Sequence, residues 1–481
     1  MRDIAENALQ AALDAGAGYA DVRVQEVDTE EVSVRNGVLE TAEQATSAGM
    51  GVRVLIDGAW GFAATYQLDG ANPAALAHTA VDVGRASARV KRRDVLLAPA
   101  EAECGHYETP YREDPFAVSL SEKVDLLVAA SEAMRTDPRI LAAFAALGLR
   151  RERTVFVSSE GSRLTQTILQ TGTGISATAA DDRDAQHRSY PGGHGGQHAC
   201  AGFELVRDLA LVQAAPQVAE EALALLTAPA CPDGTTSVIL DGSQVALQIH
   251  ESVGHPTELD RILGTEAAYA GTSFLNPSDL GRLRYGSQHV TIVSDGTTPG
   301  GLGTVGWDDE GVRPSSTYLI RDGLLVGFQT SRETAAVIGQ DRSNGTMRAD
   351  GWINYPLIRM TNVSLLPGDS SLEELIASTD DGIYMTTNRS WSIDDMRKNF
   401  QFGCEVAWEV KAGKLGRMLK NPVYQGITTE FWGSCDGIAG PGEWKVWGVP
   451  NCGKGQPMQT ARVGHGAAPA RFRNVAVRAG E

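Results

Sequence analysis

The sequence predicts an α+β fold in which two N-terminal α-β-β-β-α type modules precede a large β-rich C-terminal domain. In the first 228 residues the order helix, strands, helix occurs twice, which indicates a repeated unit. After residue 227, short strands separated by Gly, Asp and Asn turns dominate. The 481 residues, 42% of them hydrophobic, can bury more than one core. We therefore expect domains at 1–100, 101–228 and 229–481.

The first module is predicted from helical periodicity at its ends and from alternation between them. Asn36-Gly37 and Asp57-Gly58 are hairpin signals, because these residues accept the positive φ angles that tight turns require. The expected elements are a helix at 3–15, strands at 20–25, 31–35, from 38 and at 51–56, and a helix at about 72–88.

The second module repeats this order. A turn at Glu160-Gly161 separates its two clearest strands. We expect a helix at 121–135, strands at 153–158 and 163–170, and one long helix at 205–226. The Pro- and Glu-rich stretch 98–115 is predicted to be the linker between the two modules.

The C-terminal domain should contain few helices apart from one after the strand 236–240 and another at 371–378. The run 301–306 matches GxGxxG and follows a strand at 290–293. A turn-like segment comes next in place of a helix. Because dinucleotide binding needs strand, loop and helix in that order, we reject a Rossmann interpretation.

Charge and hydropathy exclude two classes of function. The net charge of −18 repels a phosphate backbone, so nucleic-acid binding is not expected. No apolar run reaches the roughly 18 residues that a membrane-spanning helix needs. The N-terminus resembles the start of an amphipathic helix rather than a signal peptide. The six cysteines show no disulfide spacing, so we expect a cytoplasmic protein.

The run His250-Glu251-Ser252-Val253-Gly254-His255 carries the most chemical information. Zn²⁺ binds neutral imidazoles, and a catalytic site keeps one position for water, for which Glu251 would be the base. On a regular α-helix, residues five apart lie about 140° apart, too far round to share one ion. Gly254 would allow a π-bulge or an early helix end. The motif therefore predicts a zinc site on a distorted helix.

The context of this motif favours a metal site over two ordinary histidines and a solvated glutamate. The strand 236–240, a turn at 241–243 and an apolar helical face from Val245 would direct both histidines inward. Glu258 and Asp260 follow closely, as partners that fix imidazole tautomers usually do.

A third ligand must come from elsewhere, and chemistry alone leaves several candidates. They are Glu258, Asp260, His289, Cys404, Cys435, Cys452 and His465. Cys435 and Cys452 both lie in Gly-rich loops that could approach an ion, and Lys454 could help to keep Cys452 as a thiolate. Either cysteine could equally be a small buried apolar residue, which free cysteine usually is.

Three further histidines lie in or near the glycine-rich stretch 190–198. They are His187, His194 and His198. They could bind a metal, but the surrounding glycines indicate a flexible excursion, so we do not expect a second metal site there.

Several separate segments resemble the TldD/PmbA family of metallopeptidases, specifically its catalytic TldD branch. They are 250–260, 308–312 leading into 317–323, 359–363 and 451–456, and together they span most of residues 230–460. The resemblance implies that His250, His255 and Cys452 are the zinc ligands and that Glu251 is the catalytic base. It thereby distinguishes Cys452 from Cys435. Non-catalytic PmbA/TldE partners lack the zinc motif, which this chain keeps whole.

Two functions follow from these observations. The first is zinc-dependent hydrolysis of unfolded or small extended peptides by a β-rich zinc-peptidase domain. The second is a peptide-binding or regulatory subunit with a structural metal, closed by a fourth ligand such as Cys435. Glu251 argues against the second function, because a structural site does not need it. The resemblance also implies a two-fold assembly, either a homodimer or a heterodimer with a non-catalytic PmbA/TldE-type paralogue.

Overall fold

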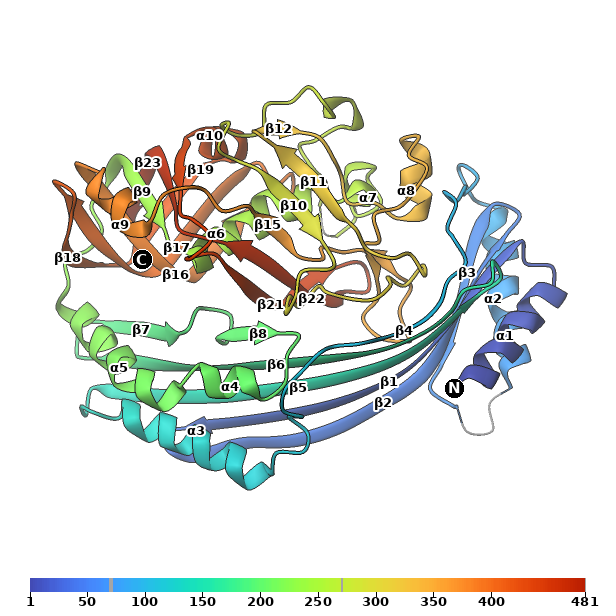
Figure 1. Cartoon of the computed structure of the whole chain (residues 1–481), viewed down its shortest axis with the longest axis horizontal. Helices are drawn as coiled ribbons and strands as arrows, with labels where there is room; N and C mark the ends of the chain where they lie inside the picture. The colour runs from blue at the N-terminus through green and yellow to red at the C-terminus, as the bar shows by residue number, and fades with distance from the viewer. Residues whose placement is uncertain (69–71, 270, 481) are drawn as a thin grey trace.

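The computed structural model describes residues 1–68, 72–269 and 271–480. Its N-terminal half is one long, curved sheet, and the C-terminal part lies on the concave side of that sheet (Figure 1). Helices from both N-terminal modules lie on the convex side, near opposite ends (Figure 1). The mixed α+β class predicted from the sequence is confirmed.

The first module has the predicted helix, strands, helix order, but its strands are longer than predicted: the segments 20–25 and 31–35 belong to one strand, and the segments from 38 and at 51–56 to another. Its elements are α1 (Arg2–Asp14), β1 (Tyr19–Arg35), β2 (Val38–Ile56), β3 (Ala59–Thr65) and α2 (Pro73–Ala88). Asn36-Gly37 and Asp57-Gly58 form the two hairpin turns, and all four residues have positive φ, from 48° to 77°. The side chain of Asn72 caps α2 by accepting a hydrogen bond from the backbone N–H of Ala75.

The second module differs from the prediction in several places: its two predicted strands are much longer, two further strands follow them, the long helix is divided, and the linker contains a strand. Its elements are β4 (Cys104–Glu108), α3 (Leu120–Met134), β5 (Ile140–Ser158), β6 (Arg163–Ala180), β7 (Ala185–Tyr190), β8 (Gln197–Ala199), α4 (Glu204–Asp208) and α5 (Leu211–Thr227). The single helix predicted at 205–226 is wrong, because Ala210 adopts a left-handed φ of 47° and separates α4 from α5. The stretch 98–115 is not only a linker, because β4 within it pairs with β6.

The two modules share one sheet, with the strand order β3-β2-β1-β5-β6-β4 and with β7 and β8 also paired to β6. The strands β1 and β5 join the modules in antiparallel register from Asp21 opposite Ser158 to Arg35 opposite Phe144. Two hydrophobic clusters, one for each group of helices, anchor the helices to this sheet. The repeated units therefore form a continuous platform for the C-terminal domain.

The C-terminal part is rich in short strands, as predicted. A seven-stranded sheet has the order β16-β9-β23-β19-β17-β18 with β20 on β23, and a four-stranded sheet has the order β12-β11-β10-β15. Two further pairs are β13 with β14 and β21 with β22. No helix follows residues 301–306, which agrees with rejecting a Rossmann site.

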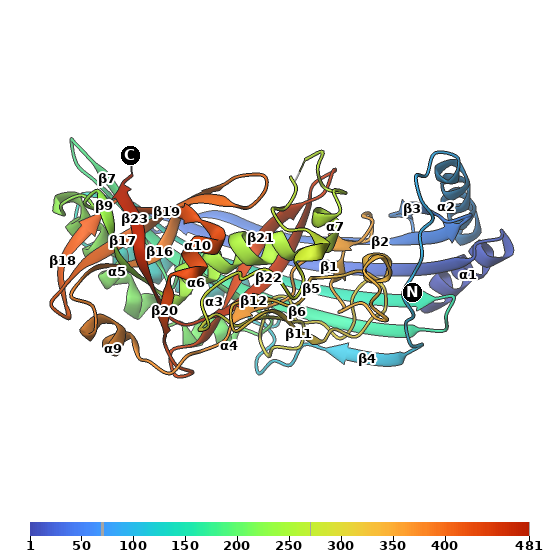
Figure 2. The same cartoon turned by 90° about the horizontal axis from the view of Figure 1, so that it is seen from above.

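The bounds of these strands are β9 (Gly234–Leu240), β10 (Ile292–Asp295), β11 (Ser316–Arg321), β12 (Leu324–Leu325), β13 (Met347–Arg348), β14 (Leu357–Ile358), β15 (Val363–Leu365), β16 (Asp381–Ile393), β17 (Asn399–Lys411), β18 (Lys414–Lys420), β19 (Pro422–Ile427), β20 (Cys435–Ile438), β21 (Lys445–Lys454), β22 (Gln459–Ala467) and β23 (Ala470–Ala479). The helices are α6 (Gly242–Ile249), α7 (Leu259–Ile262), α8 (Arg332–Val337), α9 (Leu372–Ala377) and α10 (Thr428–Gly433). Seen from above, α6 and β21 lie over the long strands of the N-terminal sheet (Figure 2).

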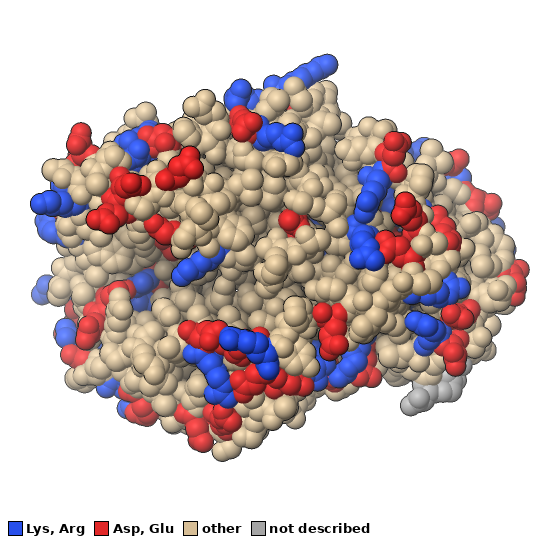
Figure 3. Space-filling view, in the orientation of Figure 1, with Lys and Arg blue, Asp and Glu red and all other residues tan. Residues whose placement is uncertain are grey.

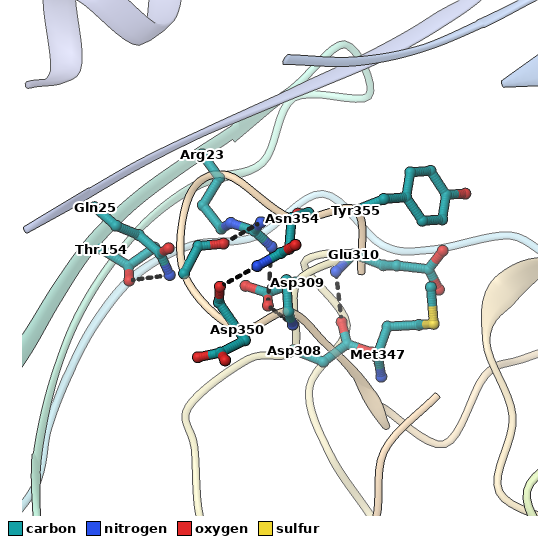
Figure 4. A network of polar contacts seen from close by, with 12 residues as sticks. Arg23, Gln25, Thr154, Asp308, Asp309, Glu310, Met347, Asp350, Asn354 and Tyr355 are labelled. Atoms are coloured by element: carbon teal, nitrogen blue, oxygen red, sulfur yellow. Dashed lines mark hydrogen bonds and ion pairs between the residues drawn. The ribbon is translucent and has the colours of Figure 1, made fainter. Parts of the chain in front are cut away.

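A buried polar network attaches the sheet to the C-terminal domain (Figure 4). Arg23 of β1 forms an ion pair of 2.9 Å with Asp309 and donates hydrogen bonds to the carbonyls of Gly351 and Asn354. Asp308 accepts hydrogen bonds from the backbone N–H groups of Glu310, Val312 and Met347 and so shapes the loop that presents Asp309. The segment 308–312 is thus part of the junction between the two halves.

The surface carries both signs of charge. On the face in Figure 3, acidic and basic side chains are interspersed without a basic patch. Within the part of the chain that the structure describes, no helix is long and apolar enough to cross a membrane.

Candidate metal centre

The motif 250–255 lies at the point where α6 changes its helical geometry. Asp241 caps α6 by accepting hydrogen bonds from the N–H groups of Ser243 and Gln244. The α-helix then continues as a π-helical turn, His250–Gly254, in which the N–H of His255 donates to the carbonyl of His250. This wider turn places the two imidazoles together, with ring centroids 4.8 Å apart. Of the two predicted distortions, the structure contains the π-bulge.

Gly254 is needed for space rather than for backbone freedom. Its φ of −57° and ψ of −64° are right-handed helical values that any residue can adopt. A Cβ atom at this position would lie 2.0 Å from Sδ of the buried Met360. The side chain of Gln329 supports the turn by donating a 2.7 Å hydrogen bond to the carbonyl of Gly254.

Cys452 reaches the two histidines from the hairpin β21–β22. Its Sγ atom lies 3.5 Å from Nε2 of His255. Possible ligand atoms of His250, His255 and Cys452 all lie within 4.8 Å of one another, and all three residues are buried. Among the described residues these are the only three that form such a group. Cys435 is not part of it.

Hydrogen bonds donated by the Nδ1 atoms of His250 and His255 fix the tautomer and the orientation of both imidazoles. Nδ1 of His465 lies 2.8 Å from the carbonyl of Val363, which can only accept, so this nitrogen carries the proton. Nε2 of His465 then accepts from Nδ1 of His250, 2.8 Å away. Nδ1 of His255 lies 3.0 Å from the Glu258 carboxylate and donates to it. Nε2 of both His250 and His255 is therefore left unprotonated, which is the form that binds a metal.

The surroundings keep these groups in their ligand forms. Burial lowers the pKa of His250 and lowers that of His255 further, so both imidazoles stay neutral. Burial alone would raise the pKa of Cys452, but its surroundings hold that pKa below the ordinary value, and the permanent positive charge of Arg359 contributes to this lowering while His255 is neutral. Arg359 also donates a hydrogen bond to the carbonyl of Cys452.

Lys454 does not have the role that the sequence analysis gave it. Its ammonium lies 2.8 and 2.9 Å from the two carboxylate oxygens of Asp260 and also donates to the carbonyl of Ile358. The cation that favours the Cys452 thiolate is Arg359 instead. The ion pair of Lys454 with Asp260 connects the end of β21 to the segment that follows residues 250–255.

Glu251 is buried beside the ligand group and is paired with a residue that the sequence analysis missed. Nη1 of Arg397 lies 2.5 Å from Oε2 of Glu251. Arg397 lies at the tip of the β16–β17 hairpin with a φ of 63°. Nothing in the local pattern of residues 394–398 marks this arginine as part of a site 146 positions away in sequence.

The other candidates for the third ligand have different places. Glu258 and His465 support the imidazoles, and Asp260 pairs with Lys454. His289 is exposed, and Cys404 is buried in β17, where burial raises its pKa well above the ordinary value. The Sγ atom of Cys435 faces the carbonyl of Gly437 at 4.0 Å.

The three histidines of the second module do not form a metal group within the described residues. His187 contacts Thr178, with Nδ1 3.0 Å from the hydroxyl. Burial lowers the pKa of His194 and of His198 to about 4. His194 packs against Trp391, with ring centroids 5.1 Å apart, and is near enough to His250 for the two to interact electrostatically. The loop therefore packs against β16 of the C-terminal domain.

Comparison with known proteins identifies families and relatives that share this architecture. A model of the PmbA/TldA metallopeptidase C-terminal domain matches residues 233–478, and models of domain 1 and the central domain match residues 20–83 and 113–227. A metalloprotease of Methanocaldococcus jannaschii is 29% identical over 448 residues, which cover 93% of this chain and 94% of that protein. A zinc metalloprotease TldD homolog of Saccharolobus solfataricus is 30% identical over 200 residues, 40% of this chain and 42% of that protein.

Among solved structures, TldE from Thermococcus kodakarensis has a similar fold. The TM-score is 0.74 at 17% identity, over 99% of this chain and 100% of that one. The C-terminal family model alone matches more than half of the sequence. The chain therefore belongs to the PmbA/TldD family of metallopeptidases.

Proposed function

We propose that the chain is a zinc-dependent peptidase, with His250, His255 and Cys452 as metal ligands and Glu251 as the catalytic base. The observation that supports this most directly is the grouping of two unprotonated Nε2 atoms and one thiol beside a buried carboxylate. Two imidazole nitrogens and a thiolate suit Zn²⁺. Three protein ligands leave a position open, as a catalytic site requires.

The residues of this site divide the work of hydrolysis. Bound there, zinc would act as a Lewis acid toward the scissile carbonyl and the attacking water. Glu251 would take a proton from that water and deliver it to the leaving nitrogen. Arg397 would hold the Glu251 carboxylate in one orientation, because its ion pair fixes one of the two oxygens.

The substrate we propose is an unfolded or small extended peptide. A strand-rich domain can bind such a peptide by main-chain hydrogen bonds, which read little sequence. We also propose a two-fold assembly, as a homodimer or with a non-catalytic PmbA/TldE-type paralogue. The similarity in fold to TldE supports the second form.

The test measures metal content and turnover of an unstructured peptide in the same protein samples. The wild type should contain zinc and hydrolyse the peptide. Glu251→Gln should keep the zinc but lose at least about 100-fold in turnover, because ligation and proton transfer use different groups. The matched control is Glu430→Gln, an exposed residue of α10, which should behave as the wild type. Near-normal turnover by Glu251→Gln with full zinc would remove Glu251 from the mechanism.

A further inference from the structure

A second acidic side chain, that of Glu266, lies in the segment that follows the motif. Glu266 follows α7 and is only 8% exposed. Within the described ranges, no hydrogen bond or ion pair reaches its carboxylate. Buried carboxylates are normally paired or hydrogen-bonded, because removing an ion from water is costly. The Glu266 carboxylate is therefore free to pair with a group that enters from the adjoining cavity.

The Glu266 side chain lines a cavity of about 460 Å³. Four separate segments form the wall, and they supply Phe62 of β3, Tyr355, Leu357 and Gly455 as well as Glu266. The rings of Phe62 and Tyr355 meet edge to face at 6.2 Å. A volume of this size lies in the range of small-ligand sites. The wall combines apolar side chains with uncharged polar ones, such as Asn354, Gln456 and Gln459, and Glu266 is its only charged residue among those that the structure describes.

The charged groups around this cavity do not neutralise Glu266. Lys454 and Arg261 both favour the ionised form of Glu266, but neither forms an ion pair with it that the structure describes. The ammonium of Lys454 is occupied by both oxygens of Asp260 and by the carbonyl of Ile358, and Arg261 pairs with Glu258. Burial raises the pKa of Glu266, and Lys454 only partly opposes this effect. A cation placed in the cavity would restore the balance.

The cavity and the metal centre are built on the same two chain segments. Gly455 directly follows Lys454 at the end of β21, the strand that carries Cys452. Thr265 and Glu266 follow α7, which begins four residues after His255. The ion pair between Lys454 and Asp260 lies where these segments meet. The cavity is therefore lined in part by direct continuations of the segments that carry the candidate ligands.

We propose that this cavity is a substrate subsite that binds a cationic group of the peptide. The ammonium or guanidinium group pairs with Glu266, while its aliphatic part packs against Phe62, Tyr355 and Leu357. The source of the charge is a lysine or arginine side chain or the terminal amine. The inference rests on the proposed peptidase function, because it assigns a preference to the same substrate.

The test measures peptide binding rather than hydrolysis, using the zinc-loaded Glu251→Gln protein and fluorescent unstructured peptides. One pair of peptides differs by lysine against norleucine, and the other by a free against an acetylated N-terminus. The cationic member of one pair should bind about 10- to 100-fold more tightly, as expected for a charge-assisted hydrogen bond. The pair that shows the difference identifies the source of the charge.

Adding Glu266→Gln should remove this difference, and adding Glu430→Gln should leave it intact. Zinc content of each variant reports whether the fold has been kept. Equal binding of both members of each pair, or a difference that survives Glu266→Gln, would overturn the subsite. If the wild type hydrolyses no peptide, the proposed function fails, whereas a charge preference that depends on Glu266 would still establish the subsite.

Discussion

Replacing Gly254 by Ala tests whether the metal centre depends on close packing behind the π turn. The added methyl would lie 2.0 Å from Sδ, 3.2 Å from Cγ and 3.3 Å from Cε of Met360. Carbon and sulfur atoms in contact normally lie about 3.5–4.0 Å apart, so one group must move by more than 1 Å. Met360 is fully buried in the core of the C-terminal domain and has little room.

Overpacking of this kind costs about 1–3 kcal/mol. The helical preference of Ala over Gly returns about 0.5–1 kcal/mol. We therefore expect Gly254→Ala to lower the free energy of unfolding by about 1–2 kcal/mol. Zinc affinity should fall about tenfold, since 1.4 kcal/mol corresponds to that factor and the turn positions both histidines.

A double-mutant cycle with Met360→Ala distinguishes this explanation from backbone strain. Met360→Ala alone should cost about 2–5 kcal/mol through the cavity it leaves. In the double variant the new methyl enters that cavity. The loss of unfolding free energy in the double variant should therefore be about 1–2 kcal/mol smaller than the sum of the losses in the two single variants. Urea unfolding of the zinc-free protein and chelator competition for zinc provide the two readouts. Additive effects in both would refute the packing explanation.

Three further predictions concern the ligands and the assembly. Cys452→Ala should lose most of the bound zinc while Cys435→Ala keeps it, as measured by metal analysis after dialysis, and the reverse result would overturn the ligand assignment. His465→Ala should lower zinc affinity about 10- to 100-fold, because His250 would lose the acceptor that fixes its tautomer; unchanged affinity in chelator competition would contradict this. Activity should be high on a disordered peptide and low on the same sequence inside a stable folded domain, and light scattering should give the mass of a dimer. Equal cleavage of both substrates, or full activity from a monomer, would refute an enclosed cleft.

Local signals in the sequence predict local structure well in this protein. Asn36-Gly37 turns the first hairpin, and the spacing of His250 and His255 requires the helical distortion that the structure contains. The physical reason for Gly254 differs from the one inferred from sequence, because it depends on Met360, more than a hundred residues later. A pattern within one segment carries no information about what packs against it.

Long-range features are the ones that sequence patterns miss. Residues 38–47 of β2 are mostly exposed on both faces, so the alternation that signals a strand is absent there. The pairing of β4 with β6 and the reach of Arg397 to Glu251 depend on tertiary contacts. Alternation and periodicity predict which side of a single helix or strand is buried. A contact between two elements also depends on where the second element lies, which these patterns do not predict.

The two halves of the chain contribute different residues to the candidate metal site and to the cavity beside Glu266. The three candidate ligands, Glu251 and both partners that fix the histidine tautomers belong to residues 229–481. From the N-terminal half, His194 packs against Trp391 of the C-terminal domain and Phe62 lines the cavity beside Glu266. The Arg23–Asp309 ion pair fixes the sheet against the C-terminal domain. In the function proposed above, the C-terminal domain would supply the chemistry, and the N-terminal modules would contribute to the walls around the substrate.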